Sequence, residues 1–96
     1  MQKSEIINII RKSKPELAAR YGVSEVGLFG SFVHREENAS SDIDILVSFN
    51  RDIDLLDFVD LKQLLEAKLR ARVDLVMRSA LKPAIGKRIL QEVEFV

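Results

Sequence analysis

LFGSFVHREENASSDID, residues 28–44, is the stretch that decides the fold of this chain. Leu28-Phe29 ends one apolar segment and runs into Gly30-Ser31. Ten residues further on, Asp42-Ile43-Asp44 opens a second apolar segment. Two carboxylates at the start of an otherwise apolar strand are unfavourable unless a cation neutralises them. The stretch therefore predicts two strands that bring a charged site to one end of a sheet.

Helical and strand patterns alternate along the rest of the chain. β-branched and apolar residues predict strands at 23–29, 43–47 and 73–77, and a short terminal strand at 94–96. Helical spacing predicts helices over 3–13, from Pro15 to Gly22, over 54–70 and from Pro83 onward, with a short helix or turn at 31–36 and a loop at 36–41. This alternation indicates the α/β class: one domain, residues 1–96, in which helices flank a small sheet.

Apolar stripes predict which faces of the later helices pack against the sheet. The stripe of the 54–70 helix consists of Leu55, Phe58, Val59, Leu61, Leu65 and Leu69. The stripe of the last helix consists of Ile85, Ile89 and Val93. The aspartates at the start of the 54–70 helix are explained by capping and by the helix dipole, which makes a second metal site there unnecessary.

The composition limits the classes of function. Lys plus Arg and Asp plus Glu number 15 each among the 96 residues, so the formal net charge is zero and extended nucleic-acid binding is not expected. Without cysteine and with a single histidine, the chain has no disulfides, no thiolate metal site and no His-rich zinc site. No apolar run has the length of a membrane span or a secretory signal, so we expect a cytoplasmic protein.

Asp42, Asp44 and Asp74 are the candidate metal ligands. Side chains two positions apart in a strand point to the same face, so Asp42 and Asp44 project together. If the 73–77 strand lies beside theirs, Asp74 joins them, and three carboxylates suit a two-metal site for phosphoryl displacement. The competing interpretations are a solvated strand end for the first two residues, and an ion pair of Asp74 with Arg72 or Arg78.

Gly30-Ser31 is the candidate phosphate site. Backbone N–H groups in a turn that follows a strand and opens a helical turn favour anions. Glycine lets a phosphate approach the backbone closely, and the Ser31 hydroxyl can donate to a phosphate oxygen. An isolated Gly-Ser after a strand is more often only a turn, so the prediction depends on the order and spacing of Gly30-Ser31 and the aspartates together.

Gly30-Ser31, ten residues and then Asp42-Ile43-Asp44 resemble the signature of the DNA polymerase beta-like nucleotidyltransferases. The later Val73-Asp74-Leu75-Val76 strengthens the resemblance, and the short chain is similar to the minimal nucleotidyltransferases that act as antitoxins beside HEPN-domain toxins. The resemblance implies a mixed sheet and catalysis with two Mg²⁺ ions. It also implies that Asp42, Asp44 and Asp74 hold the metals, while Gly30 and Ser31 hold the triphosphate.

One turn departs from the family pattern. Members often have Gly-Ser-x-Ala-Arg-Gly after the first strand, whereas this chain has His34 in place of the arginine and Arg35 in place of the glycine. We expect Arg35 to contact the nucleotide phosphates from this shifted position. The three aspartates of the metal site match the family.

The resulting functional prediction is transfer of AMP from Mg-ATP to a tyrosine of a partner HEPN toxin, which the chain silences as an antitoxin. The neutral charge and the lack of a separate acceptor-binding domain favour a protein acceptor over a long nucleic acid. Two alternatives remain open: transfer to a small molecule or an RNA end, and a non-catalytic antitoxin that masks the toxin. The sequence leaves the oligomeric state open and allows a homo-oligomer. The cations Lys82, Lys87 and Arg88 are expected to be a solvated helix face, with contact to a phosphate or an acidic partner as the alternative.

Overall fold

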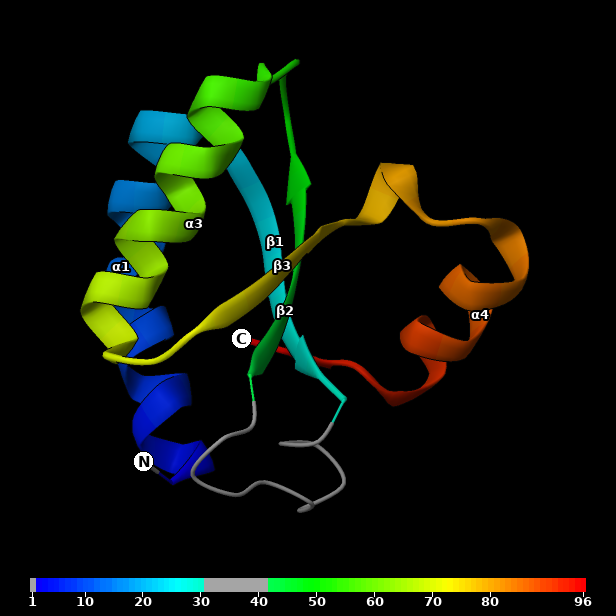
Figure 1. Ribbon diagram of the computed structural model, residues 1–96, viewed down its shortest axis with the longest axis horizontal. Helices are drawn as coiled ribbons and strands as arrows, with labels where there is room; N and C mark the ends of the chain where they lie inside the picture. The colour runs from blue at the N-terminus through cyan, green and yellow to red at the C-terminus, as the bar shows by residue number, and fades with distance from the viewer. Residues whose placement is uncertain (1, 31–41) are drawn as a thin grey trace.

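A mixed four-stranded sheet, in the order β3-β2-β1-β4, forms the centre of the computed structural model, which describes residues 2–30 and 42–96 (Figure 1). Strand β1 (Val23–Phe29) pairs antiparallel with β2 (Ile43–Phe49), and β2 pairs parallel with β3 (Val73–Met77). The short strand β4 (Glu94–Phe95) pairs antiparallel with β1. The predicted α/β class and the mixed sheet are confirmed.

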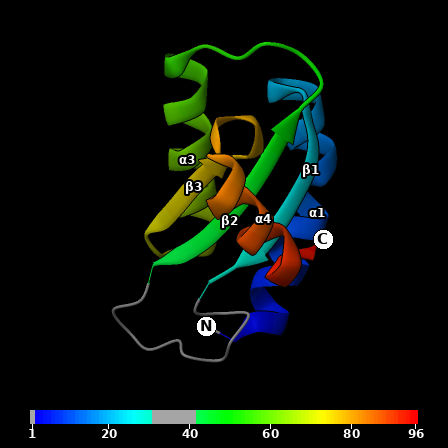
Figure 2. The ribbon, with the colours of Figure 1, turned by 90° about the vertical axis from the view of Figure 1, so that its right-hand side faces the viewer.

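The helices are distributed unequally over the two faces of the sheet. Helices α1 (Lys3–Tyr21) and α3 (Leu55–Leu69) lie side by side on one face, and α4 (Pro83–Glu92) lies on the other side, after the short helix η1 (Arg78–Ala80) (Figures 1 and 2). Successive side chains of a strand point to opposite faces of the sheet, so every second residue points toward α1 and α3. The main core therefore lies between the sheet and α1 with α3, and its fully buried members include Ile6, Ile10, Leu28, Ile45, Leu61 and Leu65.

Helix α1 corrects the prediction of two separate helices over 3–13 and from Pro15. It is one helix of 19 residues with Pro15 inside it. Proline removes a backbone hydrogen bond in a helix and costs about 3 kcal/mol. The buried residues of α1 continue at helical spacing across the proline, from Ile6 and Ile10 to Leu17 and Tyr21, so burial of one continuous stripe outweighs that cost.

The ends of α1 and α3 are fixed by capping and by a contact between the two helices. Gly22 adopts a left-handed conformation with φ 73° and ends α1 as predicted, with its N–H donating to Ala18 O at 2.9 Å. The Asp54 carboxylate accepts the Asp57 N–H at 2.8 Å and begins α3. The Tyr21 hydroxyl donates to the Asp60 carboxylate and joins the two helices.

The predicted stripes of the later helices are only partly buried. In α3, Leu61, Leu65 and Leu69 are in the core, but the side chain of Leu55 is 74% exposed and that of Val59 is 41% exposed. The prediction for these two residues is wrong because the buried stripe is narrower than predicted: the fully buried residues of α3 are only Leu61, Leu65 and Leu69. Ile85 of α4 is also exposed. Across the described residues, no helix combines the length and apolarity needed to cross a membrane.

Candidate active site

Asp44 and Asp74 are brought together by the parallel pairing of β2 and β3. They are register partners, each the second residue of its strand. Register partners on neighbouring strands lie about 4.8 Å apart in the backbone and point to the same face. Asp44 is half-buried and Asp74 is exposed, on the face opposite α1 and α3. Like charges directly opposite each other in a sheet are destabilising, so this pair favours a bound cation.

Asp42 lies just before β2, two residues from Asp44, where its carboxylate forms an ion pair with Arg72 Nε at 3.2 Å. The Arg72 side chain is 76% exposed, and an ion pair so exposed contributes little and opens easily. The alternative in which Arg72 or Arg78 pairs with Asp74 is not observed, since Arg72 pairs with Asp42 and Arg78 pairs with Glu25 at 2.8 Å. No pattern in the sequence indicates the contact between Asp42 and Arg72.

Gly30 lies directly against the Asp44 carboxylate. Phe29 is the register partner of Asp44, and Gly30 follows it in a left-handed conformation with φ 74°. A Cβ atom on Gly30 would lie 2.1 Å from Asp44 Oδ2, a distance that no real side chain allows. Glycine at position 30 thus makes room for the carboxylate itself. Sequence reasoning assigned Gly30 to phosphate binding alone, because only the pairing of β1 with β2 shows this second role.

The remaining predicted site residues belong to the segment 31–41, which lies outside the described residues. Ser31 and Arg35, the predicted phosphate contacts, are in this segment, as is His34. The predicted short helix or turn at 31–36 and the loop at 36–41 also fall there. The described residues Gly30 and Asp42 lie at the end of the sheet where Asp44 and Asp74 lie (Figure 2).

The donor set fits a hard divalent cation such as Mg²⁺, although the residues that the structure describes contain no ready-made group of three His, Cys, Asp or Glu side chains that could hold a metal. Carboxylate oxygens are the ligands that magnesium prefers. Asp44 and Asp74 already share one face, and Asp42 would join them by exchanging its exposed contact with Arg72 for the metal. The three-carboxylate metal site remains a prediction.

A separate cavity of about 860 Å³ lies at the opposite end of the parallel strands. It is lined by residues after the ends of β2 and β3, among them Asn50, Arg51 and Ser79. Arg51 is engaged there with the Arg20 carbonyl oxygen at 2.7 Å. The carboxylate site and this cavity are thus at different ends of the sheet, and only the former gathers the predicted site residues.

Comparison with known proteins places this geometry in a family. The model of the family "Polymerase beta, Nucleotidyltransferase" matches residues 4–96. The protein adenylyltransferase MntA of Thermococcus cleftensis is 50% identical over 92 residues, which cover 96% of this chain and 93% of that protein. A solved structure assigned as a minimal nucleotidyltransferase has a TM-score of 0.82 and 36% identity, with coverage of 98% of this chain and 95% of the other.

A more distant likeness extends to a toxin–antitoxin complex. A chain in the structure of a triply AMPylated Shewanella oneidensis HEPN toxin with an MNT antitoxin has a TM-score of 0.69, with coverage of 99% of this chain and 71% of that chain. Its identity is 23%, so this likeness concerns the fold alone. The family match over nearly the whole chain and the relative at 50% identity agree with the carboxylate pair on the sheet. The chain therefore belongs to the polymerase beta nucleotidyltransferase family.

Proposed function

We propose that this chain transfers AMP from Mg-ATP to a tyrosine hydroxyl of a partner HEPN toxin and thereby acts as the antitoxin. The observation that carries the proposal is the register pair of Asp44 and Asp74, with Gly30 against the Asp44 carboxylate. The relative at 50% identity is named a protein adenylyltransferase, which supports a protein acceptor. The complex of an AMPylated HEPN toxin with an MNT antitoxin supports the choice of partner.

The aspartates would organise the reaction. Asp42, Asp44 and Asp74 would hold two Mg²⁺ ions, which when bound neutralise the triphosphate and lower the pKa of the attacking hydroxyl. The acceptor oxygen forms a bond to the α-phosphorus, and the bond from that phosphorus to the pyrophosphate oxygen breaks. The hydroxyl proton passes to Asp74, the more exposed carboxylate of the register pair.

The turn after β1 would bind the phosphates. The Gly30 backbone has no side chain to keep a phosphate away, and Ser31 donates its hydroxyl to a phosphate oxygen. Arg35 adds a positive charge from the same turn. Catalysis of this kind depends on positioning and charge stabilisation, with little covalent work for the protein.

A protein acceptor also agrees with the shape of the site. The helices α1 and α3 cover the opposite face, so an acceptor reaches the carboxylates from the side on which α4 lies (Figure 2). The formal net charge of zero offers no broad electrostatic attraction for a long nucleic acid.

The test mixes the purified chain with Mg-ATP and the purified product of the neighbouring gene, which the proposal expects to be the HEPN toxin. Intact-mass spectrometry is expected to find AMP added to the HEPN protein, and peptide mapping is expected to place it on a tyrosine. The variant Asp44→Asn is expected to lose transfer while keeping its fold, because it removes one charge from the carboxylate pair. The matched control is Asp52→Asn, which changes an exposed aspartate beyond the other end of β2 and should transfer normally.

Two results would overturn the proposal. Transfer that survives in Asp44→Asn would refute the site, and AMP appearing only on RNA or a small molecule would refute the acceptor. If Asp44→Asn still neutralised the toxin as well as the unchanged chain does, masking by surface contact would replace transfer as the mechanism.

A further inference from the structure

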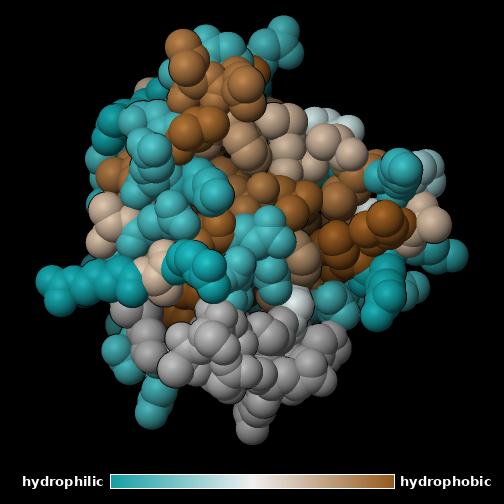
Figure 3. All heavy atoms as spheres, viewed as in Figure 1, coloured by the Kyte–Doolittle hydropathy of each residue, from teal (hydrophilic) through white to brown (hydrophobic). Residues whose placement is uncertain are grey.

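An apolar groove with a basic rim lies between α4 and the segment before it. Its volume is about 610 Å³, and it is lined by Arg78, Leu81, Lys82, Pro83, Gly86, Lys87, Leu90 and Gln91. None of these residues belongs to the carboxylate site. Figure 3 shows hydrophobic surface over α4, bordered by hydrophilic side chains.

The groove exists because α4 packs closely at only one point. Gly86 is buried, and a Cβ atom there would lie 3.3 Å from Leu81 Cβ, so the segment before α4 meets the helix at this glycine. Leu90, which lines the groove, is 38% exposed, and Ile85, which lies on α4 outside the groove, is 53% exposed. A helix with a polar and an apolar face normally buries the apolar one, so α4 presents a surface that a partner can cover.

The charges around the groove have one sign. Lys82, Lys87 and Arg88 are exposed, and none of them forms an ion pair with another described residue. Arg78 adds a fourth cation, which is engaged with Glu25. From its first residue to Gln91, α4 contains no acidic residue. In a chain with a formal net charge of zero, this concentration of cations selects an acidic partner.

The groove lies on the same side of the sheet as the carboxylates. A Cβ atom on Gly27 would lie 2.7 Å from Val93 Cγ2, so the chain leaving α4 rests against Gly27. Gly27 is the register partner of Leu46, which shares a face of β2 with Asp44. Figure 2 shows α4 in front of this face. A protein seated on α4 would therefore be held on the side from which the acceptor must approach.

We propose that this groove docks an acidic, apolar segment of the acceptor protein and presents that protein to the carboxylate site. The inference rests on the proposed function for the identity of the acceptor. Apolar side chains of the segment would cover Leu81 and Leu90, and its carboxylates would meet Lys82 and Lys87, with Arg88 next to them on α4. These charges would speed encounter and select the partner, while the apolar contacts would retain it.

A second copy of this chain is the rival occupant. The start of α3 is also acidic and apolar, since Leu55 and Leu56 are exposed beside Asp54 and Asp57. The position of the groove favours the acceptor, because a second copy on α4 would stand on the side from which the acceptor approaches.

The test measures binding of the purified product of the neighbouring gene, the expected HEPN acceptor, by calorimetry without nucleotide. The triple variant Lys82→Glu/Lys87→Glu/Arg88→Glu is expected to raise the Kd at least tenfold. Leu90→Ser is expected to raise the Kd as well, with less dependence on salt. In the transfer assay the triple variant should raise the KM for the acceptor and leave the KM for ATP unchanged.

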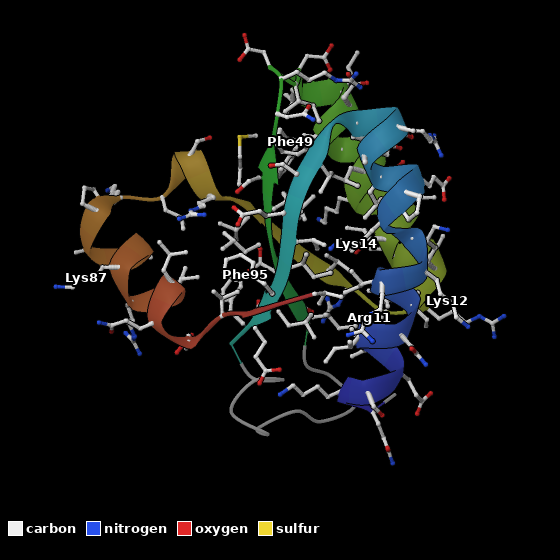
Figure 4. The ribbon with its side chains drawn as sticks, turned by 180° about the vertical axis from the view of Figure 1, so that it is seen from behind. Arg11, Lys12, Lys14, Phe49, Lys87 and Phe95 are labelled. Carbon is white, nitrogen blue, oxygen red and sulfur yellow. The ribbon has the colours of Figure 1, made fainter. Side chains whose placement is uncertain are left out.

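The matched control reverses three exposed cations on the helical layer, Arg11→Glu/Lys12→Glu/Lys62→Glu, and should bind as the unchanged chain does. Figure 4 shows Arg11 and Lys12 on α1 and Lys87 on α4 at opposite sides of the molecule. Binding by the α4 triple variant equal to that of the control would overturn the inference. So would sedimentation showing that the α4 cations hold two copies together while acceptor binding is unchanged.

The experiments distinguish a failure of the docking site from a failure of the proposed function. A chain that binds through α4 without transferring AMP would leave the docking site standing and remove the proposed function. Transfer with an unchanged acceptor KM in the triple variant would leave the function standing and remove the docking site.

Discussion

The two faces of the sheet differ in what covers them and in what they carry. On the face beneath α1 and α3, β2 places Ile43, Ile45 and Val47 in a fully buried core. On the other face the same strand places Asp44 half-buried, beside the exposed Asp74. One face thus holds the fold together, and the other keeps charged groups within reach of a ligand. Substitutions on the two faces should therefore change stability and activity separately.

The largest expected effect on stability comes from the covered face. Leu65→Ala removes a side chain that is 1% exposed, and such a cavity costs about 2–5 kcal/mol of unfolding free energy. Urea unfolding should show this loss, while AMP transfer by the folded variant stays unchanged. Leu56→Ala, an exposed position on the same helix, should change stability by less than about 0.5 kcal/mol. Lost transfer in a fully folded Leu65→Ala would mean that the two faces are coupled.

The next largest expected effect is on the rate of AMP transfer, and it comes from a substitution on the carboxylate face. In Gly30→Ala the new Cβ must displace the Asp44 carboxylate, because it would lie 2.1 Å from Oδ2. A displacement of about 1 Å at a reacting centre costs roughly 100-fold in rate, so single-turnover transfer should fall by about that factor. Backbone strain at φ 74° adds about 1–2 kcal/mol to the loss of stability.

Gly22→Ala is the matched control for that substitution. Gly22 has φ 73°, and a Cβ there would lie 2.7 Å from Asn50 Oδ1, so the backbone strain and crowding are similar. It lies at the other end of β1, away from the carboxylates. Gly22→Ala should lose stability and keep its rate of transfer. Equal loss of transfer in both variants would show that the Gly30 effect is only unfolding.

The two faces of the sheet also differ in how well the sequence predicts them. The near-continuous apolar run of 43–47 predicts a strand buried on both faces, and Ile45, Leu46 and Val47 are all buried. The stripe around Leu65 predicts the covered face of α3, because burial repeats at every third or fourth residue of a helix. The pattern fails at Pro15, where a local rule predicts a break and the buried stripe from Ile10 to Leu17 outweighs it. It also fails at Leu55, since apolar spacing alone does not show how wide the buried stripe of a helix is.

The site was predictable where it depends on neighbours in the sequence. Their two-residue spacing predicts Asp42 and Asp44 on one face, and this stays a prediction because Asp42 lies just before β2 and pairs with Arg72. The register of Asp44 with Asp74 depends on which strands pair, and a 30-residue separation does not decide that. The same is true of Gly30 against the Asp44 carboxylate. The exposed apolar side chains of α4 could not be predicted for a related reason. The amphipathic pattern of α4 predicts that one face is covered, but it does not indicate which segment covers it.

The smallest expected effect concerns the hydrogen bond between α1 and α3, the two helices that cover one face of the sheet. Burial, and then the hydrogen bond to Asp60, raise the pKa of Tyr21 to about 12, while the nearby Arg20 opposes the rise. The folded state therefore favours the protonated phenol more than the unfolded chain does. This stabilisation is complete below pH 10, near the ordinary pKa of tyrosine, and is lost as the pH rises from about 10 to 12.

Stability should thus fall by roughly 2 kcal/mol between pH 9 and pH 12 from this group alone. Lysines titrate in the same range, so the measurement compares urea unfolding of the unchanged chain with that of Tyr21→Phe, which keeps the lysines and lacks the phenol. The unchanged chain should lose more stability than the variant across this window. Parallel curves would mean that the Tyr21 hydroxyl is as accessible to water in the folded state as in the unfolded one. The contact with Asp60 would then not hold α1 against α3, and the stability of the covered face would depend on its apolar packing alone.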